Sequence, residues 1–293
     1  MMGAMTDPTG PDEYLLTLDC PDRPGIVHAV SGFLTERTCN ILDSQQYGDP
    51  ETGRYFMRVH LAPLDPTVTA DLLGTEFVDV ATSFAMTWAL VPAAERTRVL
   101  IMCSREGHCL NDLLFRWRSG TLPVDVVGVV SNHLDLGGLV EPYGVPYHYL
   151  PVSSETRADA ESRLLQLVGD LDVELVVLAR YMQVLSPELC RAMVGRMINI
   201  HHSFLPGFTG ARPYHQAHDR GVKIIGATAH YVTPVLDDGP IIEQDVVRVR
   251  HDQGATALAA AGRDVECQVL ARAVRWHCER RVITNGARTV VFS

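Results

Sequence analysis

The sequence predicts an α/β protein of two domains, a ferredoxin-like βαββαβ domain followed by a domain built on a mostly parallel sheet. The first observation is the order of strand and helix patterns over residues 13–91, which is that of the split βαβ motif. The second is that apolar runs alternate with helical stretches after residue 97, as in parallel sheets covered on both faces. The third is the segment Leu90–Ile101, in which a proline, alanines and charges separate the two patterns. A chain of 293 residues is also long enough for two domains.

The N-terminal domain is predicted over residues 12–91, and its elements follow in order. A strand over 13–20 precedes a helix over 22–37, in which Asp22 lies near the start and Pro24 suits the first turn. The residues expected to share one face of this helix are Ile26, Val27, Val30, Phe33 and Leu34. The remaining elements are strands over 39–49 and 53–62, a helix over 69–82 and a closing strand over 84–91.

The second domain is predicted over residues 98–293. Its expected strands lie at 98–103, 124–131, 146–150, 173–179, 196–200, 223–232 and 240–249. The last long segment, 255–281, predicts a packed helix because apolar residues repeat along it, namely Leu258, Val265, Val269 and Trp276. We expect the sheet to be mostly parallel, with ligands beyond the carboxyl ends of its strands.

Composition excludes several classes of function. With 46% hydrophobic and 20% charged residues, the chain resembles an ordinary soluble globular protein, and it lacks an apolar run long enough to span a membrane. A net charge of −10 argues against a nucleic-acid partner, which requires a basic surface. The first 14 residues lack the features of a secretion signal, so we expect a loose terminus and a cytoplasmic protein. The 7 cysteines are scattered without a CxxC pair and are expected to be reduced.

Polar side chains gather where the predicted strands of the second domain end. They are Ser104, Ser131, Asn132, Asn199, His201, His202, His230 and Asp237. In INIHHSFLPGFTGARPY, strand alternation places Asn199 and His201 on the same side, so an amide and an imidazole share one wall. Asp237, in the turn LDDGP, supplies a carboxylate that can reach the same cleft. An amide donor, an imidazole and a water-orienting carboxylate suit chemistry at a carbonyl group.

A structural interpretation of these residues stays open, and a zinc site is a further alternative. Asn and His at a strand end are also common as local caps, and Asp before Gly is common in turns. A zinc site is disfavoured for two reasons. Adjacent His201 and His202 would point apart on a strand, and His215 and His218 lie at i, i+3 without a carboxylate motif. We therefore expect no metal.

The segment REGHCLND, at the end of the first strand of the second domain, also has two interpretations. Cys109 near a helix start is either an activated thiol or a small buried residue. Gly107 could open a phosphate-holding turn, but the segment matches neither GxGxxG nor a P-loop. A nucleotide cofactor is therefore not expected.

These residues carry a resemblance to known families. INIHHSFLPGFTGARPY followed by GATAHYVTPVLDDGPIIEQDVVRV resembles the folate-dependent formyltransferase fold over residues 98–290, which implies a Rossmann-like domain. CPDRPGIVHAVSGFLTERTCNI resembles the ACT regulatory domain. Together with GHCLNDLLFRW and VVSNH, this combination is similar to the formyltetrahydrofolate deformylase family over nearly the whole chain.

The resemblance implies a reaction and a set of residues. The reaction is hydrolysis of 10-formyltetrahydrofolate by water to formate and tetrahydrofolate, which balances one-carbon pools and supplies formate for purine synthesis. No cofactor is implied, because the folate is the substrate. The implied catalytic set is Asn199, His201 and Asp237, supported by His230 and Ser203. The residues implied to hold the folate are Met182, Gln183, Val184, Leu185, Val232, Thr233 and Leu236.

Other activities remain as alternatives to hydrolysis. One is transfer of the formyl group to an amine, as in the glycinamide ribonucleotide formyltransferases. Those enzymes hold a substrate phosphate on a small Gly-Ser-Asn turn, whereas Gly107-His108-Cys109 is bulkier here. Transfer to methionyl-tRNA is less favoured, because this acidic chain ends soon after its last helix. A regulatory binding module without activity would have little reason to keep the whole catalytic set.

The resemblance to ACT domains implies an effector site and an assembly. Asp22, Arg23 and Gly25 lie at the start of the first helix, where free backbone N–H groups can receive a ligand carboxylate. We expect a small amino acid such as glycine or methionine as effector, and a homo-oligomer.

Overall fold

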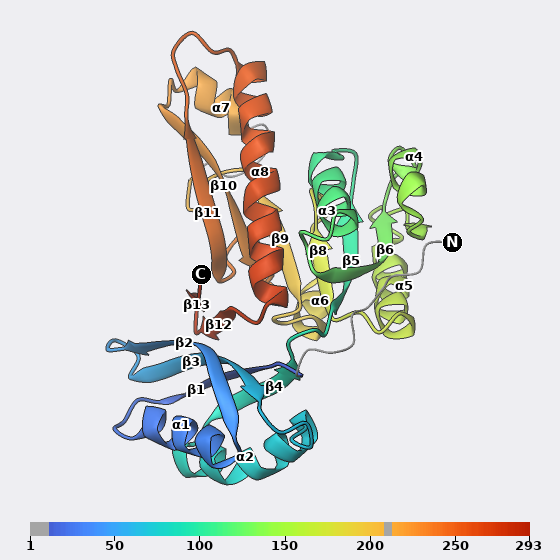
Figure 1. Ribbon diagram of the computed structural model, residues 1–293. Coiled ribbons are helices and arrows are strands. Elements are labelled where there is room, and N and C mark those ends of the chain that lie inside the picture. The colour runs from blue at the N-terminus through green and yellow to red at the C-terminus, as the bar shows by residue number, and fades with distance from the viewer. Residues whose placement is uncertain (1–11, 208–212) are drawn as a thin grey trace. The chain divides into compact units, whose positions relative to one another are not determined.

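The computed structural model describes residues 12–207 and 213–293 (Figure 1). The expected loose terminus, and part of the loop that ends INIHHSFLPGFTGARPY, lie outside the described residues. The chain divides into two compact units. One holds the chain up to Glu95 with Glu279–Ile283 and Val290–Ser293, and the other holds Arg96–Cys278 with Thr284–Thr289. The sequence patterns alone had placed all of 98–293 in the second domain.

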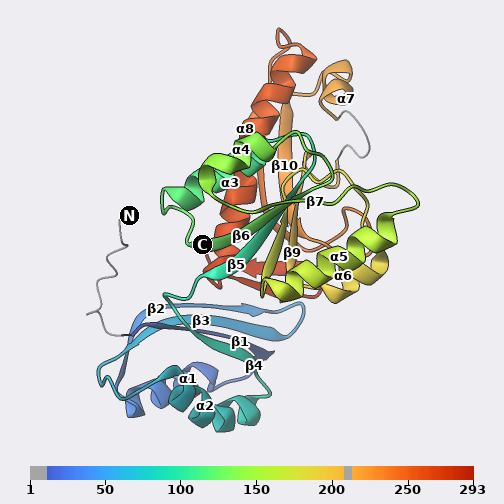
Figure 2. The ribbon, with the colours of Figure 1, turned by 90° about the vertical axis from the view of Figure 1, so that its right-hand side faces the viewer.

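The N-terminal unit has the predicted βαββαβ order. Its elements are β1 Tyr14–Pro21, α1 Ile26–Glu36, β2 Cys39–Asp49, β3 Arg54–Pro63, α2 Ala70–Phe84 and β4 Thr87–Pro92. The strands form an antiparallel sheet in the order β2-β3-β1-β4. Figures 1 and 2 show α1 and α2 together on one face of this sheet.

The two helices of this unit are held by the apolar face that the sequence predicts. Ile26, Val30, Phe33 and Leu34 of α1 are buried. Val27 was expected with them but is 43% exposed, because it lies at the edge of the buried stripe. Phe33 meets Phe77 of α2 edge to face, with ring centroids 5.1 Å apart. Aromatic pairs of this kind add specificity to the packing of the helices.

The second unit is built on a seven-stranded sheet. Its strands are β5 Thr97–Cys103, β6 Val124–Ser131, β7 Tyr147–Tyr149, β8 Leu175–Leu178, β9 Met197–His201, β10 Ile224–Tyr231 and β11 Ile241–Arg248, in the order β11-β10-β9-β8-β5-β6-β7. Five strands, β9-β8-β5-β6-β7, are parallel, which confirms the expected mostly parallel sheet. The strand β10 runs antiparallel to both of its neighbours, β9 and β11, an orientation that apolar runs alone do not reveal.

Helices cover both faces of the seven-stranded sheet. They are α3 His108–Arg118, α4 Gly137–Val140, α5 Arg157–Asp170, α6 Pro187–Ala192, α7 Pro213–Asp219 and α8 Ala255–Cys278, with a 3-10 turn, η1, at Glu141–Tyr143. Figure 2 shows α3 and α8 on one face and α5 and α6 on the other. The long helix α8 packs against α3 and against β9, β10 and β11. Three side chains of α8 are buried, as their spacing predicts: Leu258, Val265 and Val269.

A short hairpin follows α8 and was not predicted. Its strands are β12 Val282–Asn285 and β13 Arg288–Val291, joined through Gly286, whose φ is 63°. Four-residue strands carry too little pattern to be recognised in a sequence. Within the described ranges, no helix has both the length and the apolar character to span a membrane.

Candidate active site

A cleft of about 300 Å³ opens beyond β8 and β9. Its lining includes residues from three segments: the loop after β8, the end of β9 and the turn after β10. From the predicted set, the structure brings together Asn199, His201, His230, Asp237, Met182, Gln183, Val184, Leu185, Val232, Thr233 and Leu236. Ser203 lies behind this wall, bonded to His201. Strand ends that are far apart in the sequence therefore meet at one site.

Asn199 and His230 face each other across two antiparallel strands, because β9 and β10 pair them in register. The Nδ1–H of His230 donates to the Tyr231 carbonyl oxygen at 2.9 Å. Burial lowers the pKa of His230, which keeps the ring neutral. Its Nε2 then accepts a hydrogen bond from Asn199 Nδ2 at 3.2 Å. This chain of bonds fixes the direction of the Asn199 amide and leaves its second N–H for another acceptor.

His201 and Asp237 are in hydrogen-bond contact inside the cleft. His201 Nδ1 lies 3.2 Å from Asp237 Oδ1, and His201 Nε2 lies 2.9 Å from Ser203 Oγ. The hydrogen bond from His201 lowers the pKa of Asp237, against the opposing effect of its partial burial. Asp237 is thus an ionised acceptor at neutral pH. Both ring nitrogens of His201 have protein partners, which assigns this histidine first to holding the carboxylate.

The turn that carries Asp237 is fixed by close backbone packing. Asp237 has a φ of 56°, in the left-handed region that few residues with side chains adopt. A Cβ on Gly239 would lie 1.7 Å from the Tyr231 carbonyl oxygen, so only glycine fits there. The Tyr231 N–H also donates to the Pro240 carbonyl oxygen at 2.9 Å. These contacts hold the turn against β10 and aim Asp237 at His201.

His202 lies in the same cleft as His201, which corrects the expectation that the two would point apart. Their rings stack with centroids 5.2 Å apart. Strand alternation fails here because β9 ends at His201. Burial, followed by the nearby charges of Arg180 and His201, lowers the pKa of His202 to about 4. His202 is therefore neutral in the folded protein near pH 7.

The low pKa of His202 predicts a loss of stability in mild acid. As the pH falls below about 6.5, the unfolded chain binds a proton at this position and the folded protein does not. Between pH 7 and pH 5 this difference removes about 2 kcal/mol from the free energy of unfolding. We expect urea titrations of His202→Gln to show a smaller loss between these pH values than the parent protein. His251→Gln, at an exposed histidine, is the control and should behave as the parent. An undiminished loss in His202→Gln would contradict the assignment.

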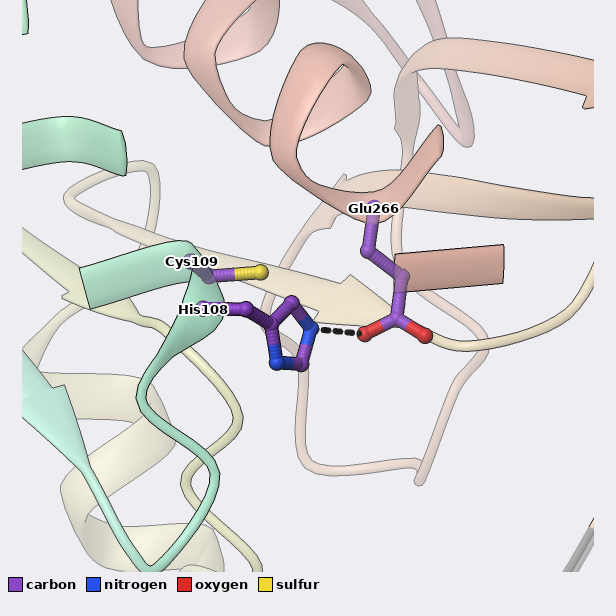
Figure 3. A group of neighbouring side chains, drawn as sticks. All are labelled: His108, Cys109 and Glu266. Atoms are coloured by element: carbon purple, nitrogen blue, oxygen red, sulfur yellow. Dashed lines mark hydrogen bonds and ion pairs between the residues drawn. The ribbon is translucent and has the colours of Figure 1, made fainter. Parts of the chain in front are cut away.

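Arg180, one of the residues that line the cleft, contacts a largely buried polar network centred on Glu266. Figure 3 shows Glu266 of α8 facing His108 and Cys109 at the start of α3. Glu266 of α8 has a side chain only 1% exposed, and its Oε2 lies 2.8 Å from His108 Nε2. The hydroxyl of Tyr214 donates to its Oε1 at 2.5 Å. Arg180 Nε lies 3.4 Å from Oε2. These partners lower the pKa of Glu266 in spite of the desolvation that favours its neutral form.

The ligand atoms of His108, Cys109 and Glu266 lie within 4.8 Å of one another, close enough to consider a metal. The chemistry of the group is unfavourable, however. Both oxygens of Glu266 already accept hydrogen bonds, and the guanidinium of Arg180 repels a cation. Cys109 is buried, and a hydrogen bond with Cys267 followed by burial raises the pKa of its thiol. These residues fit an internal ion-pair network better than a metal centre, and Cys109 is not an activated nucleophile.

The other residues singled out in the sequence have structural positions. Ser104 Oγ donates to Asn132 Oδ1 at 2.7 Å and accepts from the Met182 backbone N–H at 3.0 Å, which supports the loop after β8. Ser131 Oγ accepts from the His133 N–H. His215 and His218 lie on α7, and in the part of the chain that the structure describes they form no metal-binding group with His201 and His202.

Sequence reasoning missed Arg180, Tyr214 and Glu266. Arg180 lies two residues before the predicted folate segment that begins at Met182, but nothing in the sequence indicates its contact with Glu266. Glu266 directly follows Val265 on the buried side of α8, and a charged residue in that position was the one available signal. Tyr214 reaches Glu266 because Gly262 has no side chain: a Cβ there would lie 2.2 Å from the Tyr214 ring.

The predicted effector residues lie together at the start of α1. Gly25 has a φ of 99° and ends the turn before the helix, and no side chain caps the first N–H groups. Arg23 donates to the Ser83 carbonyl oxygen and lies 4.3 Å from the centre of the Phe84 ring. The Asp22 N–H donates to the Gly53 carbonyl oxygen at 2.8 Å. The backbone N–H groups of α1 are thus the part of this turn open to a ligand.

Comparison with known proteins matches both units. Residues 97–274 match the model of the Formyl transferase family, and residues 14–71 match that of the ACT domain. The chain is 55% identical to formyltetrahydrofolate deformylase of Corynebacterium sp. (strain P-1), over 95% of this chain and 98% of that one. The crystal structure of formyltetrahydrofolate deformylase from Burkholderia mallei ATCC 23344 has a TM-score of 0.93 and 50% identity, covering 97% of this chain and 100% of that one.

A more distant likeness concerns the second unit. Glycinamide ribonucleotide transformylase 1 from Symbiobacterium toebii has a TM-score of 0.63 and 30% identity, covering 68% of this chain and 95% of that one. The fold of the second unit is therefore shared with a glycinamide ribonucleotide transformylase.

Proposed function

The chain belongs to the formyltetrahydrofolate deformylase family, with an ACT domain followed by a formyl transferase domain, and from this we propose that it hydrolyses 10-formyltetrahydrofolate to formate and tetrahydrofolate. The observation that carries the proposal is the meeting of Asn199, His201 and Asp237 in one cleft. Formate released in this way would balance one-carbon pools and feed purine synthesis.

The amide of Asn199 serves the oxygen of the formyl group. Its Nδ2 is held by neutral His230, so that its second N–H is directed without further reorganisation. Negative charge grows on the formyl oxygen as water adds to the carbon. A preoriented donor stabilises that charge more in the transition state than in the substrate, which is the condition for catalysis.

Asp237 orients the attacking water and accepts its proton. A new C–O bond forms to the formyl carbon, and the C–N bond to the folate then breaks. One proton of water passes through Asp237 to the departing nitrogen, which leaves tetrahydrofolate and formic acid. His201 holds the carboxylate during these steps and stabilises it in the ionised form, in which it can accept a proton.

The apolar part of the cleft suits the pterin ring. Met182, Val184 and Leu236 line it and remain 57%, 54% and 67% exposed, so an aromatic ligand would bury them. Backbone groups of Gln183, Leu185 and the Val232–Thr233 segment supply polar contacts along the same wall. Exposed apolar side chains beside polar backbone groups are typical of a small-molecule site.

The network around Glu266 favours water over an amine acceptor. His108 occupies the turn where a phosphate-holding segment would be small, and its ring is tied to Glu266 at 2.8 Å. A Cβ on Gly107 would lie 2.9 Å from Leu136, so this turn is closely packed as well. A phosphorylated acceptor would have to displace the hydrogen-bonded pair of His108 and Glu266, whereas water would not.

The test is an assay of both reactions. Purified protein should release formate from 10-formyltetrahydrofolate without an added acceptor, and glycinamide ribonucleotide should not become formylated. No metal or cofactor enters the proposed steps, so we expect the rate to survive exhaustive chelation. Efficient formylation of the ribonucleotide would show that the protein transfers the formyl group to an amine, and would contradict the proposed hydrolysis. A loss of activity on chelation that a divalent ion restores would contradict the metal-free steps.

The ACT domain is proposed to regulate this activity. The uncapped N–H groups at the start of α1, beside Asp22, Arg23 and Gly25, suit the carboxylate of a small amino acid such as glycine or methionine. Gly25 lets the backbone approach closely, because it has no side chain. ACT domains tend to pair, so we propose a homo-oligomer.

Light scattering and an amino-acid titration test this part. We expect an oligomer whose hydrolysis rate changes with glycine or methionine, and Gly25→Val should weaken the response without changing the unregulated rate. An oligomer that ignores every amino acid would leave assembly as the only role of the domain. A monomer without a response would contradict both roles.

A further inference from the structure

Among the described residues that line the cleft, Arg180 is the only arginine or lysine. It belongs to the loop after β8, and β8 runs parallel to β9 with Leu178 beside Asn199. Arg180 is two residues beyond Leu178, as His201 is two residues beyond Asn199. The arginine therefore lies at the reacting end of the cleft, level with the catalytic residues.

The guanidinium of Arg180 is incompletely paired. Within the described residues its ion pair is with Glu266, whose Oε2 lies 3.4 Å from Nε, and that carboxylate also receives hydrogen bonds from His108 and Tyr214. Nη1 is buried and has no hydrogen-bond partner among the residues that the structure describes. The side chain as a whole is 13% exposed. Buried donors of this kind normally have a partner, so the site is short of an anion.

The reaction itself produces such an anion. Formic acid ionises at neutral pH, so a carboxylate appears in a cleft that already holds the negative charge of Asp237. The neighbouring rings do not balance it, because His202 and His230 are neutral and His201 is paired with Asp237. An anion in a half-buried cleft is costly unless a cation meets it. Guanidinium groups bind carboxylates through parallel N–H bonds, a geometry that an ammonium group cannot copy.

We propose that Arg180, held from behind by Glu266, forms a carboxylate subsite that binds the formate product beside the catalytic residues. The identity of the ligand rests on the proposed hydrolysis. The location of the subsite rests on the incompletely paired guanidinium of Arg180. It accepts formate once the C–N bond has broken, and Glu266 keeps the guanidinium at the wall of the cleft in the meantime.

Binding of ¹³C-formate, followed by NMR titration of the full-length protein, tests the subsite without any turnover. We expect Arg180→Met to weaken formate binding by about 10- to 100-fold, the range of a lost charge-assisted hydrogen bond. The formate affinity of Arg180→Lys should lie between those of the parent protein and Arg180→Met. Lysine keeps the positive charge but cannot donate two parallel hydrogen bonds to the carboxylate. Arg191→Met is the matched control. Arg191 is 63% exposed on α6 and pairs with Glu188, so its loss should change nothing.

A second variant covers the case in which Arg180→Met does not fold. The double variant Arg180→Met, Glu266→Gln removes both charges of the pair. The buried Glu266 carboxylate therefore does not remain without a positively charged partner. It should fold, as judged by circular dichroism, and should also bind formate weakly. Formate binding at the parent affinity in either folded variant would overturn the proposal, as would the absence of formate binding in the parent protein.

The carboxylates of the folate's glutamyl group are the other source of this chemistry. Binding of tetrahydrofolate and of tetrahydropteroate, which lacks the glutamyl group, separates them. We expect Arg180→Met to change the affinities for tetrahydrofolate and for tetrahydropteroate by the same factor. The affinity for formate should fall strongly. A loss confined to the ligand with the glutamyl group would assign Arg180 to the substrate tail instead. If the protein binds formate through Arg180 but releases none from the folate, the subsite stands and the proposed hydrolysis fails.

Discussion

Asp237→Asn is expected to lower the hydrolysis rate by about 100- to 10,000-fold, which is the usual contribution of general acid–base catalysis. The asparagine has nearly the same shape, so the turn against β10 should persist and His201 should keep a hydrogen-bond acceptor. What is lost is the negative charge that orients water and takes its proton. Folate binding should change little, since the pterin is expected to contact Met182, Leu236 and backbone groups.

The matched control for this substitution is Asp238→Asn. Asp238 is the next residue in the same turn and is exposed, so its carboxylate lies outside the cleft lining. Steady-state rates and equilibrium folate binding should be measured for both variants. If Asp237→Asn keeps most of the rate while Asp238→Asn loses it, the carboxylate has been assigned to the wrong residue.

Asn199→Ala is expected to lower the rate by about 100- to 1000-fold, as for the loss of one donor to a developing oxyanion. The effect should fall on kcat more than on KM, because the donor matters most when charge has formed on the oxygen. Asn199→Asp tests whether the effect comes from loss of the N–H donor. It keeps the size of the side chain but replaces the N–H donor by an oxygen, so it should be at least as inactive.

Asn111→Ala is the control for Asn199→Ala, because Asn111 carries the same amide at an exposed position on α3. His230→Gln adds a graded test. A glutamine can still accept from Asn199 but holds it less rigidly, so we expect a smaller loss than for Asn199→Ala. Full activity in Asn199→Ala would show that another donor binds the formyl oxygen.

The site was predictable to the extent that it depends on strand ends. The period of two in β9 was enough to place Asn199 and His201 on one wall, and polar residues at apolar strand ends marked the cleft. Asp237 was found through the turn residues around it. That the turn comes back onto His201 depends on β10 running antiparallel to β9, and apolar runs carry no information about strand direction.

Other features depend on contacts that no local pattern encodes. His202 departs from alternation because the strand stops one residue earlier, and strand ends are the least certain part of any pattern. The partners of Glu266 come from three segments far away in the chain. The fold class was the most predictable property, because it follows from the order of many elements, whereas the pairing of one buried side chain depends on their final docking.

The network around Glu266 has a consequence for how the chain is made. His108 precedes Glu266 by 158 residues and Tyr214 precedes it by 52, so these two partners, and Arg180 between them, leave the ribosome before the carboxylate that they contact. Until α8 has been synthesised, burying Arg180 would leave its charge without a counterion, which is strongly unfavourable. We therefore expect Arg180 to stay solvated until α8 has been synthesised and has packed against the sheet. Premature release of the chain before residue 266 should give a product that exposes this wall to chaperones and proteases.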